Sequence, residues 1–208
     1  MPKHSTIYVD GFNLYYGALR RGPYKWLNLE RFFTLLRQDD EIRKIWYFTA
    51  LIDGPNRANQ ETYLRALRTT PLVGIQHGRY KQKIVRCNVT NCRYRGVREF
   101  RAPEEKGTDV KIALQMLDDA YQGSCDRMVL VSGDEDLLPA VELIKQRFPH
   151  LSMTVYVPAR DPRRAAATRL RKASDKHKTL PLALLSAAQF PPTITTPSGE
   201  TIQKPTSW

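Results

Sequence analysis

The chain has 208 residues and a formal net charge of +12, with 41% apolar and 26% charged residues. This composition indicates a soluble globular chain of one domain, and no stretch approaches the roughly 20 apolar residues of a membrane span. Because its three cysteines are an odd number, we expect no disulfide framework and predict a reducing, cytoplasmic location. Residues 1–4 lead directly into a predicted strand, which leaves no room for a signal peptide.

The positive charge is concentrated in two segments. Residues 79–106 contain nine basic and three acidic side chains, and residues 160–178 contain eight basic and two acidic ones. The remainder of the chain balances to zero. Such a distribution is typical of a surface that binds a polyanion, whereas an even distribution would only favour solubility. The alternative is a flexible basic loop without a fixed partner.

Apolar periodicity predicts alternating strands and helices along the chain. Strands are expected at residues 7–9, 44–51, 72–77, 127–131 and 153–157. Helices are expected at residues 14–19, 29–37, 56–68, 109–120, 137–147 and 163–173. Asn28 and Thr108 stand at the positions of helix N-caps. This alternation predicts right-handed βαβ units, and therefore a three-layer αβα, Rossmann-like fold with a central parallel sheet.

The domain organisation follows from the same pattern. We predict one domain over residues 1–178, interrupted by the basic insertion at about 79–106. Weak alternation within the insertion is compatible with a β-hairpin. We expect a helical extension over residues 179–190. Residues 191–208 are rich in Pro and Thr with little to bury, and a flexible tail is predicted there.

Four aspartates stand where strands end or helices begin. Asp10 follows the first strand within TIYVDGFN, Asp109 lies in the first turn of a predicted helix, and Asp134 and Asp136 follow the fourth strand. Each has a structural alternative, as a turn residue, a helix cap or a partner of the helix dipole. Jointly they predict a site, because the carboxyl ends of neighbouring parallel strands meet at one edge of the sheet. Clustered carboxylates without His or Cys favour Mg²⁺ or Mn²⁺.

Three motifs together resemble the NYN domain, a branch of the PIN-like nucleases. They are VDGFN (9–13), EEKGTDVKIALQML (104–117) and LVSGDEDLLPAVELIK (130–145), and the resemblance covers about residues 5–172. It implies a PIN-like fold and a metal-dependent endoribonuclease. The family's metal-binding acids fall on Asp10, Asp109 and Asp134, and its more variable fourth acidic position falls on Asp136.

The resemblance also implies roles for two further residues. Asn13 falls on a polar position that orients water or phosphate, and Ser132 on the small hydroxyl residue that precedes the fourth-strand acid. The expected activity is hydrolysis of RNA, with basic residues offsetting phosphate charge and aromatic side chains stacking on unpaired bases. The residues predicted to contact RNA are Ser132, Lys106, Lys111, Arg93, Arg95, Arg98 and Tyr16. For Phe12, Tyr15 and Tyr80, stacking and core packing are both open, and core packing is preferred for Phe12.

Several alternatives stay open at this level. A non-catalytic RNA-binding adaptor that keeps the fold would share the basic segments, and a DNA-acting nuclease would share the acids. The expected partner is RNA, and no membrane partner is expected. A second copy of the chain and a targeting protein stay open as further partners. Cys87 and Cys92 offer only part of the four ligands of a zinc site, so zinc there is undecided.

Overall fold

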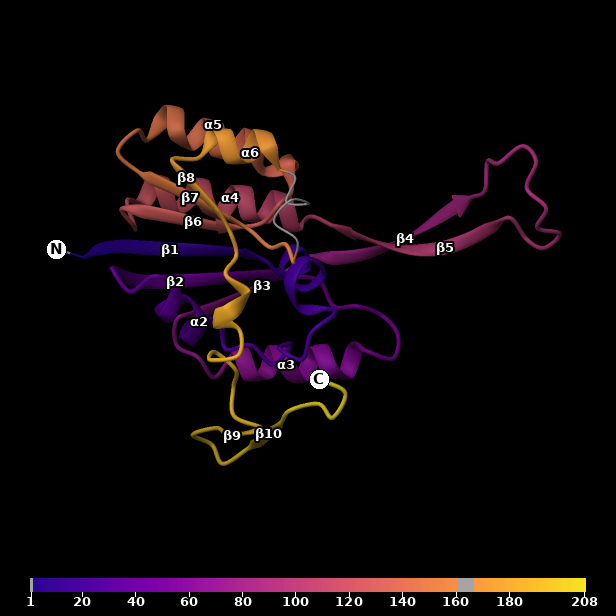
Figure 1. The fold of residues 1–208 in the computed structure, drawn as a ribbon, viewed down its shortest axis with the longest axis horizontal. Coiled ribbons are helices and arrows are strands. Elements are labelled where there is room, and N and C mark those ends of the chain that lie inside the picture. Colours follow the sequence, from indigo (N-terminus) through magenta and orange to yellow (C-terminus); the bar gives the residue numbers. More distant parts are fainter. Residues whose placement is uncertain (1, 161–166) are drawn as a thin grey trace.

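Six parallel strands form the central sheet of the computed structural model, which describes residues 2–160 and 167–208. Across the sheet the strand order is β3-β2-β1-β6-β7-β8 (Figure 1). The strands are β1 (Lys3–Asp10), β2 (Asp40–Thr49), β3 (Val73–His77), β6 (Arg127–Val131), β7 (Ser152–Val157) and β8 (Lys176–Thr179). Val9 of β1 pairs with Val131 of β6. The first and fourth predicted strands are therefore neighbours, and their carboxyl ends meet at one edge.

Helices cover both faces of this sheet. They are α1 (Gly11–Leu14), α2 (Leu29–Leu36), α3 (Arg57–Leu67), α4 (Thr108–Gln122), α5 (Leu138–Arg147) and α6 (Thr168–Ala173). Helices α2 and α3 pack on one face, and α4, α5 and α6 pack on the other (Figure 1). The three-layer αβα fold predicted from the sequence is confirmed. In the described part of the chain, no helix combines the length and apolarity needed to cross a bilayer.

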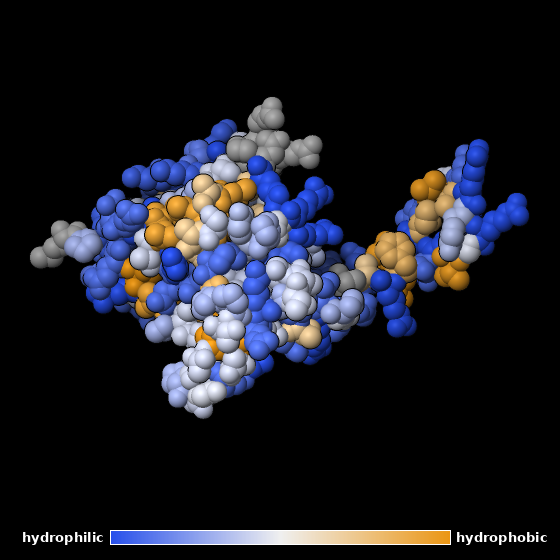
Figure 2. All heavy atoms as spheres, turned by 60° about the horizontal axis from the view of Figure 1, so that its bottom comes forward, coloured by the Kyte–Doolittle hydropathy of each residue, from blue (hydrophilic) through white to orange (hydrophobic). Residues whose placement is uncertain are grey.

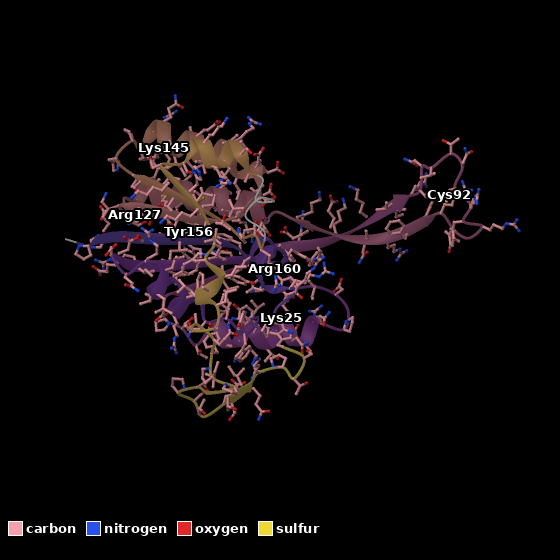
Figure 3. The ribbon with its side chains drawn as sticks, viewed as in Figure 1. Lys25, Cys92, Arg127, Lys145, Tyr156 and Arg160 are labelled. Carbon is pink, nitrogen blue, oxygen red and sulfur yellow. The ribbon has the colours of Figure 1, made fainter. Side chains whose placement is uncertain are left out.

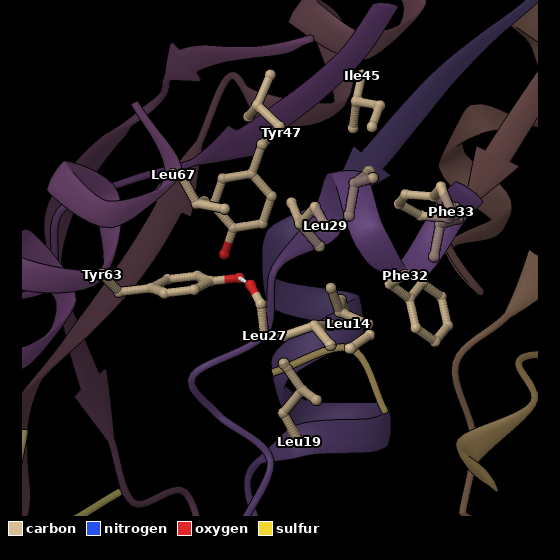
Figure 4. Packing of buried hydrophobic residues seen from close by; sticks show 14 of the residues in the cluster. Leu14, Leu19, Leu27, Leu29, Phe32, Phe33, Ile45, Tyr47, Tyr63 and Leu67 are labelled. Carbon is tan, nitrogen blue, oxygen red and sulfur yellow. Dashed lines mark hydrogen bonds between the residues drawn. The ribbon is translucent and has the colours of Figure 1, made fainter. Parts of the chain in front are cut away.

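Alternating side chains of the strands supply two separate cores. Ile7 and Val9 face the α2–α3 side, whereas Tyr8 between them faces the α4–α5 side, because successive strand residues point to opposite faces. Figure 4 shows the first core, in which Phe32 of α2 is fully buried. There the Tyr63 hydroxyl donates to the carbonyl of Leu27 over 2.9 Å.

The basic insertion forms an antiparallel hairpin, β4 (Arg79–Arg86) paired with β5 (Glu99–Lys106). We call residues 79–106 the arm, because it projects from the body of the molecule (Figure 1). Eight residues per strand give it a length of roughly 25 Å, not counting the connecting loop. Apolar side chains are exposed along it, including Ile84 and Phe100 (Figure 2).

The C-terminal segment differs from its prediction. In place of the helical extension expected at 179–190, the structure has strand β8 just before it and a single 3-10 turn at Leu182–Leu184. The expected flexible tail forms a second hairpin, β9 (Thr193–Thr195) and β10 (Thr201–Gln203). Ile202, one of its few apolar side chains, is only 2% exposed and packs against the α2–α3 core.

Three helix boundaries also differ. The first helix begins earlier, at Gly11, and continues as a π-helical turn over Tyr15–Leu19. Helix α4 begins at Thr108 itself, with Gly107 as its N-cap at φ 87°, so Thr108 is not the cap. A left-handed φ of this kind favours glycine. The basic helix predicted at 163–173 is described only from Thr168 onward, and residues 163–166 lie outside the described residues.

Candidate active site

Asp10 ends β1 as a buried carboxylate, only 3% exposed. Its Oδ1 accepts from the backbone N–H of Asn13 over 2.9 Å. Its Oδ2 accepts from Asn13 Nδ2 over 2.6 Å and from the Ser132 hydroxyl over 2.9 Å. Burial raises the pKa of Asp10, and these hydrogen bonds oppose that rise. Asp10 is thus both the N-cap of α1 and the anchor of a polar network.

The loop after β6 completes this network. Ser132 is fully buried, and its oxygen accepts from the backbone N–H of Asp134 over 3.1 Å. Asp134 caps the next turn by accepting from the N–H of Asp136 over 3.0 Å. The N–H of Gly133 donates to Asn13 Oδ1 over 3.1 Å. The ends of two neighbouring strands are therefore joined through side chains that sequence analysis assigned to the site.

Three carboxylates converge beside this network. One oxygen from each of Asp109, Asp134 and Asp136 lies within 4.8 Å of the others. Among the described residues, none of the three forms an ion pair with a basic side chain. Burial, followed by the charges of Asp134 and Asp10, raises the pKa of Asp109 to about 6. Such uncompensated negative charge is what a divalent cation with oxygen ligands would neutralise.

Glu105 also borders the carboxylates, although sequence analysis did not assign it to the site. Its pKa rises to about 7, through burial first and then through the charges of Asp109 and Asp10. It is held in place by the N–H and hydroxyl of Thr108, both of which donate to its Oε1. The signal in the sequence is the position of Glu105 four residues before Asp109, across a glycine turn.

An aromatic pocket of about 310 Å³ begins next to Asp10. We define it by its lining residues Gly11, Phe12, Tyr15, Tyr16, Leu19, Arg20, Lys25, Tyr47, Thr49, Ile52, Asn56, Gln60, Tyr63, Ser207 and Trp208. Burial and the nearby charge of Asp10 both raise the pKa of Tyr47. A Cβ on Gly11 would come within 2.6 Å of the Phe48 carbonyl and 2.8 Å of the Tyr47 hydroxyl. Only glycine therefore allows Tyr47 to lie this close to the end of β1.

A family model of the NYN domain matches residues 4–181 of this sequence. The chain belongs to the NYN domain family. A curated relative from Pseudomonas putida (strain DSM 28022 / S16) is named 6-hydroxy-3-succinoylpyridine 3-monooxygenase HspA. It is 34% identical over 239 residues, covering all of this chain and 76% of the relative. The family membership that the three sequence motifs predict is thus confirmed.

A solved structure supports the fold of this NYN domain. It is the crystal structure of a protein of unknown function from Vibrio parahaemolyticus RIMD 2210633, with a TM-score of 0.55 and 23% sequence identity. The similarity covers 86% of this chain and 94% of the other. At this identity it bears on the fold alone.

The basic residues predicted to contact RNA do not all lie near the carboxylates of the NYN domain. Lys111 Nζ donates to the His77 carbonyl over 2.5 Å at the end of β3, and Lys106 Nζ lies 3.1 Å from Glu104 at the base of the arm. Arg93, Arg95 and Arg98 belong to the loop that joins β4 and β5, which is the far end of the arm, where Cys92 is labelled in Figure 3.

Aromatic residues link the base of the arm to the pocket. Tyr16 is 59% exposed and stacks on Phe12, with ring centroids 6.3 Å apart. Phe12 in turn contacts Tyr80 of β4 edge-on at 5.7 Å. The guanidinium of Arg20 lies 5.3 Å from the centre of the Tyr16 ring. Phe12 is only partly buried, so one part of its ring packs against neighbouring side chains and another part lines the pocket.

Proposed function

We propose that this NYN domain protein is a metal-dependent endoribonuclease that cleaves single-stranded or unpaired RNA. The observation that carries the proposal is the convergence of Asp109, Asp134 and Asp136 beside Asp10, at the carboxyl edge of the parallel sheet. Ligands of α/β sheets bind at this edge. The family match supports the same activity, because NYN domains are nuclease-like.

The donor set fits Mg²⁺ or Mn²⁺. Asp109, Asp134 and Asp136 supply hard oxygen ligands, and the raised pKa of Asp109 reports the negative charge that a cation would offset. Asp10 lies near them, since its charge contributes to the raised pKa of Asp109. Asn13 and Ser132 hold its carboxylate in place, and we propose that it serves as a fixed charge and as a further ligand of the same ion. A bound divalent cation would neutralise the scissile phosphate and lower the pKa of a water molecule.

The remaining residues position RNA around the acids. Asn13 holds Asp10 on one side and the Gly133 N–H on the other, so it keeps the two strand ends at a constant spacing. Tyr16 presents an exposed ring for stacking on an unpaired base. The arm carries six excess positive charges and exposed apolar side chains, and we propose that it holds the RNA backbone away from the site of cleavage.

The test compares purified full-length protein with matched single-residue variants on a labelled single-stranded RNA. Cleavage is expected with Mg²⁺ or Mn²⁺ and not with EDTA, and Asp109→Asn and Asp10→Asn should each lower the rate on the order of a hundredfold. Asp118→Asn is the control, because Asp118 is an exposed acid on the same helix whose carboxylate accepts a hydrogen bond from Gln122 and which is not part of the carboxylate cluster. Intact RNA with either metal would refute nuclease activity, while retained RNA binding would then support the adaptor function.

A second candidate function comes from the curated relative, which is named as a monooxygenase of a pyridine compound. The specific observation in its favour is the aromatic pocket, where Arg20 and Lys25 could pair with an anionic substituent on an aromatic ring. It is tested by oxygen uptake with 6-hydroxy-3-succinoylpyridine and a nicotinamide reductant. Substrate-dependent uptake that Arg20→Ala abolishes, together with no RNA cleavage, would favour this function over the nuclease.

A further inference from the structure

A second cavity lies at the other end of the sheet from the carboxylates. Its volume is about 590 Å³, and it is lined by Lys3, Leu36, Arg37, Gln38, Asp39, Asp40, Arg127, Thr154, Tyr156, Lys176, Lys178, Thr179 and Pro181. We call it the basic cavity. It contains the first residues of β1, β2, β6 and β8, and therefore marks the amino edge of the sheet. Helices α2 and α3 lie on this face of the sheet (Figure 1).

The charge of this cavity is strongly positive. Five cationic and two anionic side chains line it. The Asp40 carboxylate is already satisfied, because its Oδ1 binds Arg127 and its Oδ2 binds Ser5 and Arg37. Burial favours a raised pKa for Asp40, but these three partners hold it below its ordinary value, so Asp40 stays ionised. The two arginines therefore compensate one carboxylate between them, and Asp39 is exposed.

The three lysines of the cavity are exposed, and their ammonium groups have no partner among the described residues. Lys176 and Lys178 alternate along β8 and pair with Thr154 and Tyr156 of β7. Residues paired in this way project to the same face of a sheet. Within the part of the chain that the structure describes, neither of these ammonium groups nor that of Lys3 forms an ion pair or hydrogen bond.

Buried donors in the same cavity also lack acceptors. Thr154 is 1% exposed, and among the described residues its hydroxyl has no hydrogen-bond partner. The same holds for Nε of Arg127. The Tyr156 hydroxyl accepts from Arg37 Nη1 over 3.2 Å, which leaves its own O–H free to donate. Figure 3 shows Arg127 and Tyr156 on the same side of the body. Buried polar groups are rarely left unpaired, so each of these donors requires an explanation.

We propose that the basic cavity binds a small organic phosphate of about nucleotide size. A phosphate group carries up to two negative charges and three terminal oxygens, which match an excess of ammonium groups and unpaired O–H and N–H donors. The cavity volume lies within the range of small-molecule sites. Leu36 and Pro181 add apolar surface for the organic part of the ligand. This site needs no metal, in contrast to the carboxylates at the opposite edge.

The proposal is tested by calorimetric titration of the full chain with ADP and with pyrophosphate in EDTA, so that the metal-dependent site is silent. Both ligands should bind and adenosine should not. Lys176→Ala combined with Lys178→Ala should weaken binding roughly tenfold or more. Arg147→Ala with Lys172→Ala is the control, since it removes two exposed cationic side chains on α5 and α6 that do not line the cavity.

A second variant keeps the test independent of folding. Thr154→Val conserves shape and removes a buried hydroxyl that has no partner among the described residues, so the thermal stability of the free protein should not fall. The stabilisation by ADP should shrink in this variant. Failure of both ADP and pyrophosphate to bind, equal binding of adenosine, or an equal loss in the Arg147/Lys172 control would each overturn the proposal. None of these outcomes depends on RNA cleavage.

Discussion

The Ser132 hydroxyl donates to Oδ2 of Asp10 over 2.9 Å and so joins the ends of β1 and β6, 122 residues apart in the chain. The same oxygen accepts from the N–H of Asp134. A single buried hydroxyl thus fixes the spacing between the first aspartate and the carboxylates that follow the neighbouring strand. This contact explains why a small hydroxyl residue occupies the position, since a larger side chain would separate the strand ends.

Replacing Ser132 with Ala should therefore reduce activity without unfolding the protein. Loss of one buried hydrogen bond costs about 1 kcal/mol of unfolding free energy. Asp10 would lose one of the hydrogen bonds that restrain its pKa, so its pKa should rise further and the acid limb of the rate profile should move to higher pH. RNA cleavage measured from pH 5 to 8 checks this; an unshifted profile in Ser132→Ala would contradict it.

The acidic group makes folding stability depend on pH. The pKa values of Asp109 and Glu105 are raised, to about 6 and about 7, so the folded state binds protons more tightly than the unfolded state. Their contribution to stability is therefore largest near pH 4 and is lost as pH rises through 6 to 7. Asp40, whose pKa is lowered, acts in the opposite direction only at lower pH.

Thermal unfolding in EDTA should show this directly. The Tm of Asp109→Asn should rise relative to that of the unmodified protein as pH rises from 5 to 7.5, because the variant lacks one half-buried negative charge. Mg²⁺ should raise the Tm of the unmodified protein at pH 7.5 more than at pH 5, where protons compete for the carboxylates. Asp118→Asn keeps all the carboxylates of the site and should follow the unmodified protein in both measurements. A gain in Tm with pH equal to that of Asp109→Asn, or loss of the Mg²⁺ response in this control, would disprove the assignment.

The arm should contribute affinity rather than chemistry. Replacing Arg93, Arg95 and Arg98 together with Ala should weaken binding to single-stranded RNA and reduce the slope of log K against log salt by up to about 2. The single-turnover rate at saturating RNA should change little, since these residues lie at the far end of the arm. Arg43, Arg57 and Arg65, which are on the body, provide a control with the same change in charge. Equal loss of affinity in both triple variants would show that the arm contributes only its net charge and no specific binding surface.

The C-terminal hairpin should be required for stability. Ile202→Ala should lower the unfolding free energy by about 2–4 kcal/mol, because this side chain is 2% exposed against the α2–α3 core. Thr193→Ala, at an exposed position of β9, should have little effect. Chemical denaturation of the two variants separates a packed hairpin from a dispensable tail. Trp208 follows the hairpin and lines the aromatic pocket, with its ring centroid 5.7 Å from that of Tyr63. Loss of the hairpin should therefore also open this pocket.

Local sequence was sufficient for the elements whose signals are local. Residues 127–131 form a short, strongly apolar run, and β6 occupies those residues. Asn28 was identified as a cap from its side chain, and its Oδ1 accepts from the N–H of Arg31 over 3.0 Å. The order of strands and helices also determined that Asp10 and Asp134 would follow neighbouring strands. These inferences succeed because periodicity and capping depend on residues within one turn of each other.

Tertiary structure decided what depends on distant neighbours. In the sequence, Glu105 cannot be told from a solvated glutamate. In the fold it is half-buried near Asp109, and burial and that charge together raise its pKa. Residues 191–208 contain too few apolar side chains to predict structure, but Ile202 and Trp208 meet a surface built by α3 and the segment around Trp26. The basic cavity likewise combines residues from five segments of the chain. Its charge is set by which side chains the fold pairs with one another, and a linear sequence does not specify that pairing.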